Sequence, residues 1–173
     1  IASELGIKNF GENYAQELVT KNPLVGPEIS WHYIGQLQSN KIRKISHLVD
    51  VWHSVTSLKL AREIHKRNDQ AQILLQVSLM GPSNTKGFEV EQLPQLISEL
   101  RDMNIDISGL MTMGVPGDMV ATRVVFKELR KLADTFELPE CSMGMSDDFE
   151  IALESGASMI RVGSAIFGNR RPD

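Results

Sequence analysis

Two short segments near the end of the chain share an arrangement of residues that suits anion binding. Residues 142–148 and 158–168 each read as an apolar run, a Gly/Ser turn and the start of a helix. Backbone N–H groups are unpaired at a helix N-terminus, where the helix dipole also favours negative charge. In the second segment, Gly163 lets a ligand approach the backbone closely and Ser164 adds a hydroxyl. We therefore expect a phosphate group on the Gly163–Ser164 turn.

The flanking side chains refine this expectation. Arg161 stands two residues before Gly163 in an apolar strand, and strand alternation puts both on the same side. Ser146 follows the first apolar run and can add its hydroxyl from the side. Asp147 and Asp148 suit the positive end of their own helix, but they would repel a phosphate placed on it. The first turn is therefore expected to contribute Ser146 and not the main phosphate cradle.

Each of these features also has a simpler explanation. A Gly-Ser turn after a strand is usually structural, because glycine is the default turn residue. Ser146 would serve well as a helix N-cap, a role that is compatible with phosphate binding. Arg161 could be an inward arginine paired with a carboxylate, since a charge is almost never buried unpaired. The residues alone leave these alternatives open.

Size and composition are those of one globular domain over residues 1–173. The chain has a formal net charge of −4, with 42% hydrophobic and 23% charged residues, and this length suffices for a real core. The acidic balance argues against a general nucleic-acid binder. The single cysteine, Cys141, excludes an intrachain disulfide framework and a Cys-rich zinc site, and it favours a reducing, cytoplasmic setting. No apolar run reaches the ~18 residues of a membrane span.

Strand-like and helix-like segments alternate along the chain. Runs near residues 7–11, 31–35, 49–55, 71–79, 107–113, 140–143 and 158–162 read as strands, and residues 12–14 are expected to open the first full helix. Strands separated by helical segments favour a parallel sheet. Seven strands after an opening helix end at residues 1–6 predict an α/β fold, a TIM-type (β/α)8 barrel whose first strand is missing. An open doubly wound sheet is the alternative.

Several longer motifs resemble a known family. They are the runs at 10–14 (Phe-Gly-Glu-Asn-Tyr), 31–41 (Trp-His-Tyr-Ile-Gly-Gln-Leu-Gln-Ser-Asn-Lys), 53–55 (His-Ser-Val), 109–113 (Gly-Leu-Met-Thr-Met), 142–146 (Ser-Met-Gly-Met-Ser) and 161–168 (Arg-Val-Gly-Ser-Ala-Ile-Phe-Gly). In this order they resemble the pyridoxal-phosphate homeostasis proteins, also described as YggS- or PROSC-like proteins. The motifs lie along the whole chain and several exceed five residues, so chance agreement is improbable.

This resemblance implies a barrel like the N-terminal domain of alanine racemase and one bound pyridoxal 5'-phosphate (PLP). It implies phosphate contacts from Ser146 and from the turn of Gly163 and Ser164, with Arg161 facing the pyridine nitrogen. An arginine there keeps that nitrogen unprotonated and weakens the ring as an electron sink. The implied role is non-catalytic: the protein buffers PLP inside the cell and passes it to PLP-dependent acceptor enzymes.

Two more residues are assigned to the cofactor site, and two histidines are not. Asn13 lies just past a strand end, where barrel sites are built, and Met145 stands next to Ser146. His32 and His53 flank apolar strand residues and are interpreted as hydrogen-bonded barrel histidines, not as acid–base groups. No catalytic or metal-ligating residue is assigned.

The resemblance also implies a lysine that holds PLP as a Schiff base at the end of the first strand, and no residue of this chain matches it. Lys8 belongs to the second strand and to a different motif. The matching position would lie about one βα unit, ~20–30 residues, before Phe10. We expect the chain to be truncated, because a barrel without that strand exposes two unpaired edges. Weak, non-covalent binding of PLP is the alternative.

Two enzyme functions compete with the carrier role. A PLP-dependent racemase or decarboxylase of amino acids would need a catalytic tyrosine or a second acid–base residue, usually lent by another domain, and only Tyr14 and Tyr33 exist here. A phosphate-sugar barrel enzyme is compatible with the Gly-Ser turn, but no obvious acid–base pair supports it. The expected partners are PLP and acceptor enzymes, without nucleic acid or membrane, and the expected assembly is a monomer or weak dimer.

Overall fold

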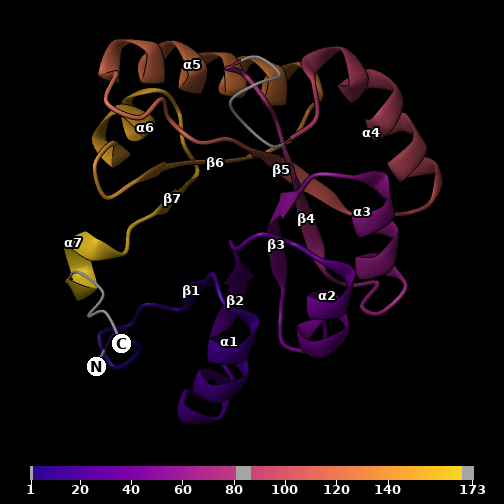
Figure 1. Ribbon diagram of the computed structural model, residues 1–173, viewed down its shortest axis with the longest axis vertical. Helices are drawn as coiled ribbons and strands as arrows, with labels where there is room; N and C mark the ends of the chain where they lie inside the picture. Colours follow the sequence, from indigo (N-terminus) through magenta and orange to yellow (C-terminus); the bar gives the residue numbers. More distant parts are fainter. Residues whose placement is uncertain (1, 81–86, 169–173) are drawn as a thin grey trace.

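The computed structural model describes residues 2–80 and 87–168, which form one curved parallel sheet covered by helices (Figure 1). Each strand pairs in parallel with the next, so the spatial order follows the chain order. This order never reverses, so the sheet lacks the switch point of a doubly wound fold and that alternative is wrong. The barrel prediction is confirmed, with seven strands in place of eight. The strands are β1 (Asn9–Glu12), β2 (Ser30–Tyr33), β3 (Val51–Val55), β4 (Gln72–Gln76), β5 (Ile107–Met111), β6 (Glu140–Met145) and β7 (Met159–Arg161).

The connections between successive strands are helical. Figure 1 shows these helices around the outside of the curved sheet, with α5 running along the side of β5 and β6. The α-helices are α1 (Ala15–Lys21), α2 (Ser39–Ile45), α3 (Leu58–His65), α4 (Leu93–Asp102), α5 (Met119–Thr135), α6 (Phe149–Glu154) and α7 (Ser164–Phe167), and the 3-10 helices are η1 (Asn22–Leu24) and η2 (Val90–Gln92).

The main hydrophobic core lies between the outer face of the sheet and the helices. Tyr33 and Trp52 are fully buried there on neighbouring strands, with their ring centroids 5.5 Å apart. Helix α5 adds Val125, Phe126 and Leu129, at the spacing that places residues on one helix face. Each such side chain stabilises the fold by about 1.5–3 kcal/mol when removed from water. This layer fixes the strands and hence the positions of the residues on their inner face.

The inner face of the sheet carries a second, much smaller apolar cluster. Val51, Leu74 and Met111 are buried together, and Met159 packs against them. Ser142 of β6 lies between Met111 and Met159 in the strand register, so its side chain belongs to the same inner face. The inner face is therefore apolar at these four positions and carries a polar side chain between them at Ser142.

The first helix begins later than the sequence indicates. Glu12 is the last residue of β1, and its carboxylate accepts hydrogen bonds from the backbone N–H groups of Asn13 (2.8 Å) and Tyr14 (3.0 Å). Lys21 then pairs with its other oxygen at 2.6 Å. The buried carboxylate thus holds 13–14 as a connection, and the helix starts at Ala15. Before β1, residues 2–6 form turns that end at Gly6 (φ 87°), not the expected helix end.

Candidate functional site

Four polar side chains from four strands form a continuous row across the barrel interior. His32 Nδ1 of β2 lies 2.8 Å from His53 Nε2 of β3. The other ring nitrogen of His53, Nδ1, lies 2.7 Å from Ser142 Oγ of β6, and Arg161 of β7 donates to the same oxygen at 2.6 Å. These four residues, called the polar row below, bring together strands that are far apart in the sequence.

Among the described residues, the guanidinium of Arg161 is held by neutral acceptors. Besides Ser142 Oγ, it donates to the backbone carbonyl of Thr112 at 3.0 Å. Within the described ranges no carboxylate oxygen lies within ion-pairing distance of it. Burial lowers the pKa of the guanidinium to about 10, while the charge of Asp148 acts in the opposite direction. The expected alternative of a carboxylate-paired arginine is therefore absent there, and N–H donors remain available to a ligand.

The surroundings of the two histidines in the polar row lower their pKa values and so favour the neutral rings. His53 is 2% exposed, and burial, with the charges of His32 and Arg161, lowers its pKa well below the ordinary value. Burial also lowers the pKa of His32, although Asp50 and Glu140 act in the opposite direction. The interpretation of both as hydrogen-bonded barrel histidines is confirmed by their contacts.

The Gly-Ser turn lies at the exposed end of β7, next to Arg161. Ser146 Oγ accepts hydrogen bonds from the backbone N–H groups of Gly163 (3.2 Å) and Ala165 (3.3 Å). Gly163 precedes the short helix α7, and a Cβ added to it would meet no atom of the described residues within 4 Å beyond its chain neighbours. Ser164 is the first, exposed residue of that helix. The hydroxyl of Ser146 and the Gly163–Ser164 turn, both predicted from the sequence, therefore lie together, and two backbone N–H groups of the turn point to the same oxygen.

The carboxylate of Asp148 does not do what the sequence indicates. Its Oδ1 accepts a hydrogen bond from the backbone N–H of Met145 at 2.6 Å, and it makes no side-chain cap on helix α6. The carboxylate instead closes the turn between β6 and α6. Ser146 Oγ accepts from Gly163 and Ala165 and does not cap its own helix.

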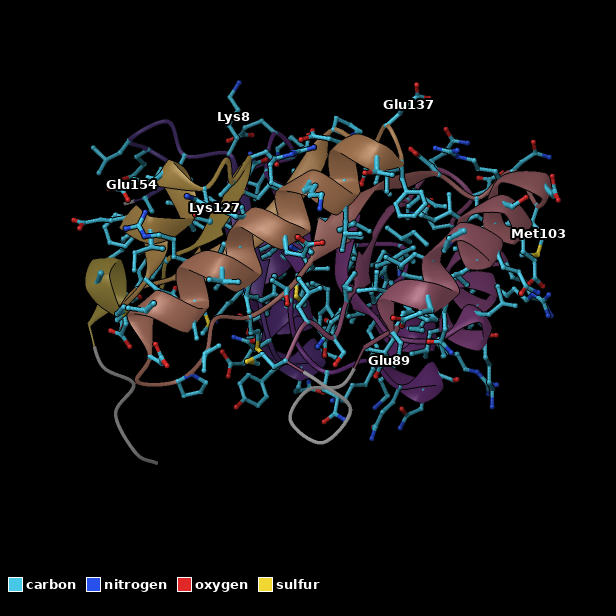
Figure 2. The ribbon with its side chains drawn as sticks, turned by 90° about the horizontal axis from the view of Figure 1, so that it is seen from above. Lys8, Glu89, Met103, Lys127, Glu137 and Glu154 are labelled. Carbon is cyan, nitrogen blue, oxygen red and sulfur yellow. The ribbon has the colours of Figure 1, made fainter. Side chains whose placement is uncertain are left out.

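The remaining predicted residues lie at the same carboxyl end of the strands. Met145 ends β6 and is 42% exposed. Asn13 follows β1 directly, and its backbone carbonyl lies so close to Gly35 that no Cβ would fit there. Lys8 is exposed and points away from the fold in Figure 2. Asn13 and Met145 are thus near the rim, while Lys8 makes no contribution to the interior.

Two contributors were missed by the sequence reasoning, Ser142 and the carbonyl of Thr112. Ser142 is completely buried and contacts both His53 and Arg161. A signal did exist, because a polar residue within an apolar strand on the face of Met159 is unusual in a hydrophobic interior. The carbonyl of Thr112 had no such signal, because every residue carries one.

The described residues meet the requirements of neither a metal site nor a membrane-spanning helix, and a separate pocket lies away from the predicted site residues. The described residues contain no group of three His, Cys, Asp or Glu side chains able to hold a metal ion. None of the described helices is long and apolar enough to cross a membrane. A surface hollow of about 430 Å³ lies at the amino ends of β2 and β3, between Asn22, Trp31, His47 and Asp50, and contains none of the predicted site residues.

Fold and interior together define a parallel α/β barrel with its candidate site at the carboxyl ends of the strands. The family described as alanine racemase, N-terminal domain, matches residues 1–171. The "Pyridoxal phosphate homeostasis protein" of Aquifex aeolicus is 37% identical, over 96% of this chain and 78% of that protein. The protein of the same name from Caenorhabditis elegans is 36% identical, over 94% of this chain and 77% of its own.

Solved structures agree with these matches. PipY of Synechococcus elongatus, solved without PLP, superposes with a TM-score of 0.89 at 34% identity, over 96% of this chain and 85% of that chain. Its structure with PLP bound gives 0.88 at 33% identity, over 96% and 84%. An alanine racemase of Clostridium difficile shares the fold, with a TM-score of 0.75 at 15% identity over 96% of this chain and 46% of that chain. The chain belongs to the pyridoxal phosphate homeostasis proteins, within the alanine racemase N-terminal domain family.

Proposed function

We propose that this chain binds pyridoxal phosphate without catalytic turnover, as part of a protein that buffers PLP and delivers it to acceptor enzymes. The observation that carries the proposal is the position of Arg161, a partly buried cation with neutral partners, two residues before an open turn rich in N–H donors. Arg161 is the last residue of β7 and Gly163 precedes helix α7, so the cation and the turn lie at the same end of the strand. The relatives named for PLP homeostasis and the PLP-bound PipY support the same ligand.

The ring end of the ligand is assigned to Arg161. A guanidinium offers donors only, so it can donate to a pyridine nitrogen that has no proton of its own. When bound, PLP supplies an aldehyde that captures amines and a ring that can withdraw electrons. An arginine at the ring nitrogen disfavours the protonated ring and so reduces that withdrawal. The residue at this position therefore suits storage of PLP better than catalysis with it.

The phosphate end is assigned to Ser146, Gly163 and Ser164. Ser146 Oγ now accepts from two backbone N–H groups, and a phosphate oxygen could take those donors in its place. The Gly163 side of the turn is open, which leaves room for the anion. Asn13 and Met145 are proposed to line the rim of the same site.

The tyrosines support the non-catalytic part of the proposal. Tyr33 is fully buried in the core between sheet and helices, on the face of β2 opposite to His32, so its phenol is remote from the polar row. Burial also raises its pKa, and Glu12 adds to the effect. Tyr14 is exposed before α1. We infer no catalytic acid–base role for either, and a reducing compartment such as the cytoplasm suits the buried free thiol of Cys141.

Equilibrium dialysis with PLP and with pyridoxal tests the proposal. We expect PLP to bind at least tenfold more tightly than pyridoxal, because only PLP carries the anion. Arg161→Gln should weaken binding of both compounds about tenfold. The control Arg123→Gln removes an exposed arginine that pairs with Glu154 on α6, and it should change neither affinity. Equal affinity for PLP and pyridoxal would contradict the phosphate assignment.

Catalysis needs a separate measurement. Alanine racemisation can be followed by deuterium uptake at the α-carbon, with the protein saturated with PLP. We expect no turnover above that of free PLP. Steady turnover that is lost on Tyr14→Phe would overturn the non-catalytic proposal and favour the racemase alternative.

A further inference from the structure

We propose that His53 is a positioning residue for Arg161. In the polar row, each member then donates a hydrogen bond to the next, from Arg161 through Ser142 and His53 to His32, and this one-way chain fixes the guanidinium on the side of Ser142. Both histidines are then neutral, with their protons on Nε2. This inference concerns the unliganded protein and bears on the proposed function, because Arg161 is the residue assigned there to the ring of PLP.

The direction of the chain follows from the hydrogen-bonding capacity of its members. Arg161 has donors only, so Ser142 Oγ must accept from it at 2.6 Å. The hydroxyl proton of Ser142 is then free to go to His53 Nδ1 at 2.7 Å. With Nδ1 accepting, neutral His53 carries its proton on Nε2 and donates it to His32 Nδ1 at 2.8 Å. His32 in turn carries its proton on Nε2.

The opposite direction leaves a buried group unpaired. If His32 donated to His53, the proton of His53 would sit on Nδ1 and point at Ser142 Oγ. The oxygen would then accept twice, and its own proton would have no acceptor within the described part of the chain. Ser142 has no exposed surface, so water cannot replace that acceptor. The one-way chain is the arrangement that leaves neither Ser142 nor His53 with an unpaired group.

A charged His53 would break the row in the same way. Both of its ring nitrogens would donate, and Ser142 would again lose its acceptor. The groups facing His53 are His32 from β2, Ser142 from β6 and Arg161 from β7; beyond them, Asp50 and Glu140 act on His32 and Asp148 acts on Arg161. None of the described carboxylates lies within ion-pairing distance of His53, while the arginine opposes a second positive charge.

The polar row holds the Arg161 side chain without neutralising its charge, which a carboxylate partner could not do. A carboxylate partner would hold the side chain but would also neutralise its charge and occupy a bidentate pair of donors. Ser142 and the Thr112 carbonyl take one donor each and bring no charge. His53 keeps Ser142 turned so that its lone pair faces the guanidinium. Arg161 is thereby fixed before any ligand arrives and keeps its charge and remaining donors.

The direct test is nitrogen-15 NMR of the histidine rings in the ligand-free protein. The chain has four histidines, and the double variant His47→Gln, His65→Gln leaves only the signals of His32 and His53. We expect both rings to be neutral Nε2–H tautomers at pH 7.5. A proton on Nδ1 of His53 overturns the one-way chain.

The positioning role is tested by hydrogen exchange of the Arg161 guanidinium. In the wild type we expect slow exchange, and in His53→Phe, which keeps a ring but no acceptor, exchange at least tenfold faster. The control His65→Phe alters a histidine on α3 outside the row and should leave the rate unchanged. If His53→Phe does not fold, His32→Gln tests the next link in the same way, with a smaller expected increase. An unchanged rate in a folded row variant overturns the positioning role.

These readouts are independent of PLP. Failure of PLP to bind while the tautomers and the slow exchange are as expected would contradict the proposed function and leave the row intact. Tight PLP binding with the opposite tautomer would contradict the row and leave the function intact.

Discussion

The two halves of the candidate site are built in opposite ways. In the polar row, every contact is between side chains or from a side chain to a carbonyl, and the members are largely buried. In the turn around Gly163, the contacts join the half-buried hydroxyl of Ser146 to the backbone N–H groups of two exposed residues, Gly163 and Ala165. The contacts between the members of the row form without a ligand, whereas the turn offers donors that a better acceptor could take over.

This difference assigns different roles to two serines that are four residues apart. Ser142 is buried, and its loss would remove one hydrogen-bond partner from Arg161 and one from His53. Ser146 caps N–H groups that water can also reach. A buried network contributes to stability because its members cannot find other partners, while an exposed cap contributes mainly to binding.

The largest expected effect comes from comparing the two serines directly. Ser142→Ala should lower the free energy of unfolding by about 3 kcal/mol, because it leaves a buried charged donor and a ring nitrogen unsatisfied. Ser146→Ala should cost about 1 kcal/mol or less, as for an exposed cap. Urea unfolding of the two variants measures the difference. Equal losses would remove the distinction between a buried row and an exposed turn.

The second expectation concerns pH. Because the folded state lowers the pKa of His53 below its unfolded value near 6.5, the unfolded chain binds more protons in mild acid. Stability contributed by neutral His53 is therefore fully present above pH 6.5 and is lost as the pH falls toward the folded pKa. The slope should approach about 1.4 kcal/mol per pH unit.

Urea unfolding between pH 7.5 and 5.0 gives that slope. The variant His53→Gln should reduce the slope, since glutamine does not titrate, whereas His65→Gln on α3 should leave it nearly unchanged. If the free energy of unfolding of His53→Gln depends on pH as steeply as that of the wild type, groups outside the polar row cause the pH dependence.

The sequence predicted the turn better than the row. Gly163 and Ser146 belong to local patterns, a strand followed by a glycine or serine turn, and such patterns need only a few neighbouring residues. The repeated strand–helix rhythm likewise predicted the parallel barrel. The starts of individual elements were less certain, as Glu12 shows, because its carboxylate caps 13–14 through a contact that helix propensity does not contain.

The polar row depends on which distant strands meet across the barrel. His53 and Ser142 are 89 residues apart in the chain, and no local pattern states that their side chains touch. The register shift between Trp52 and Val55 makes it harder still to predict which residues of β3 face the barrel interior. It breaks the simple alternation of strand faces, so the inward direction of a residue near it cannot be counted from a neighbour. The sequence could identify polar residues within the strands, but the contacts between them become visible only when the strands are arranged in the barrel.

The third expectation separates ligand binding from stability in the turn. Gly163→Ala adds a methyl group that, apart from the chain neighbours, meets no atom of the described residues within 4 Å, at a φ of −120° that other residues adopt. Its effect on the free energy of unfolding should stay within about 0.5 kcal/mol. Its affinity for PLP should fall about tenfold, or ~1.4 kcal/mol, because the methyl group occupies the space assigned to phosphate. Calorimetric titration measures the affinity, and a variant that binds PLP normally would show that the phosphate lies elsewhere.

The smallest expected effect tests the charge beside the turn. Asp148→Asn keeps an Oδ1 acceptor for the Met145 N–H but removes a negative charge near the proposed phosphate position. At the separation of neighbouring residues in a hydrated turn, one unit charge contributes about 0.5 kcal/mol, so affinity for inorganic phosphate should rise about twofold. Asp147→Asn removes an exposed charge next in sequence and serves as the matched control, with a smaller rise. If Asp148→Asn instead weakens phosphate binding, the carboxylate acts mainly by sustaining the charge of Arg161, and the two halves of the site are electrostatically coupled.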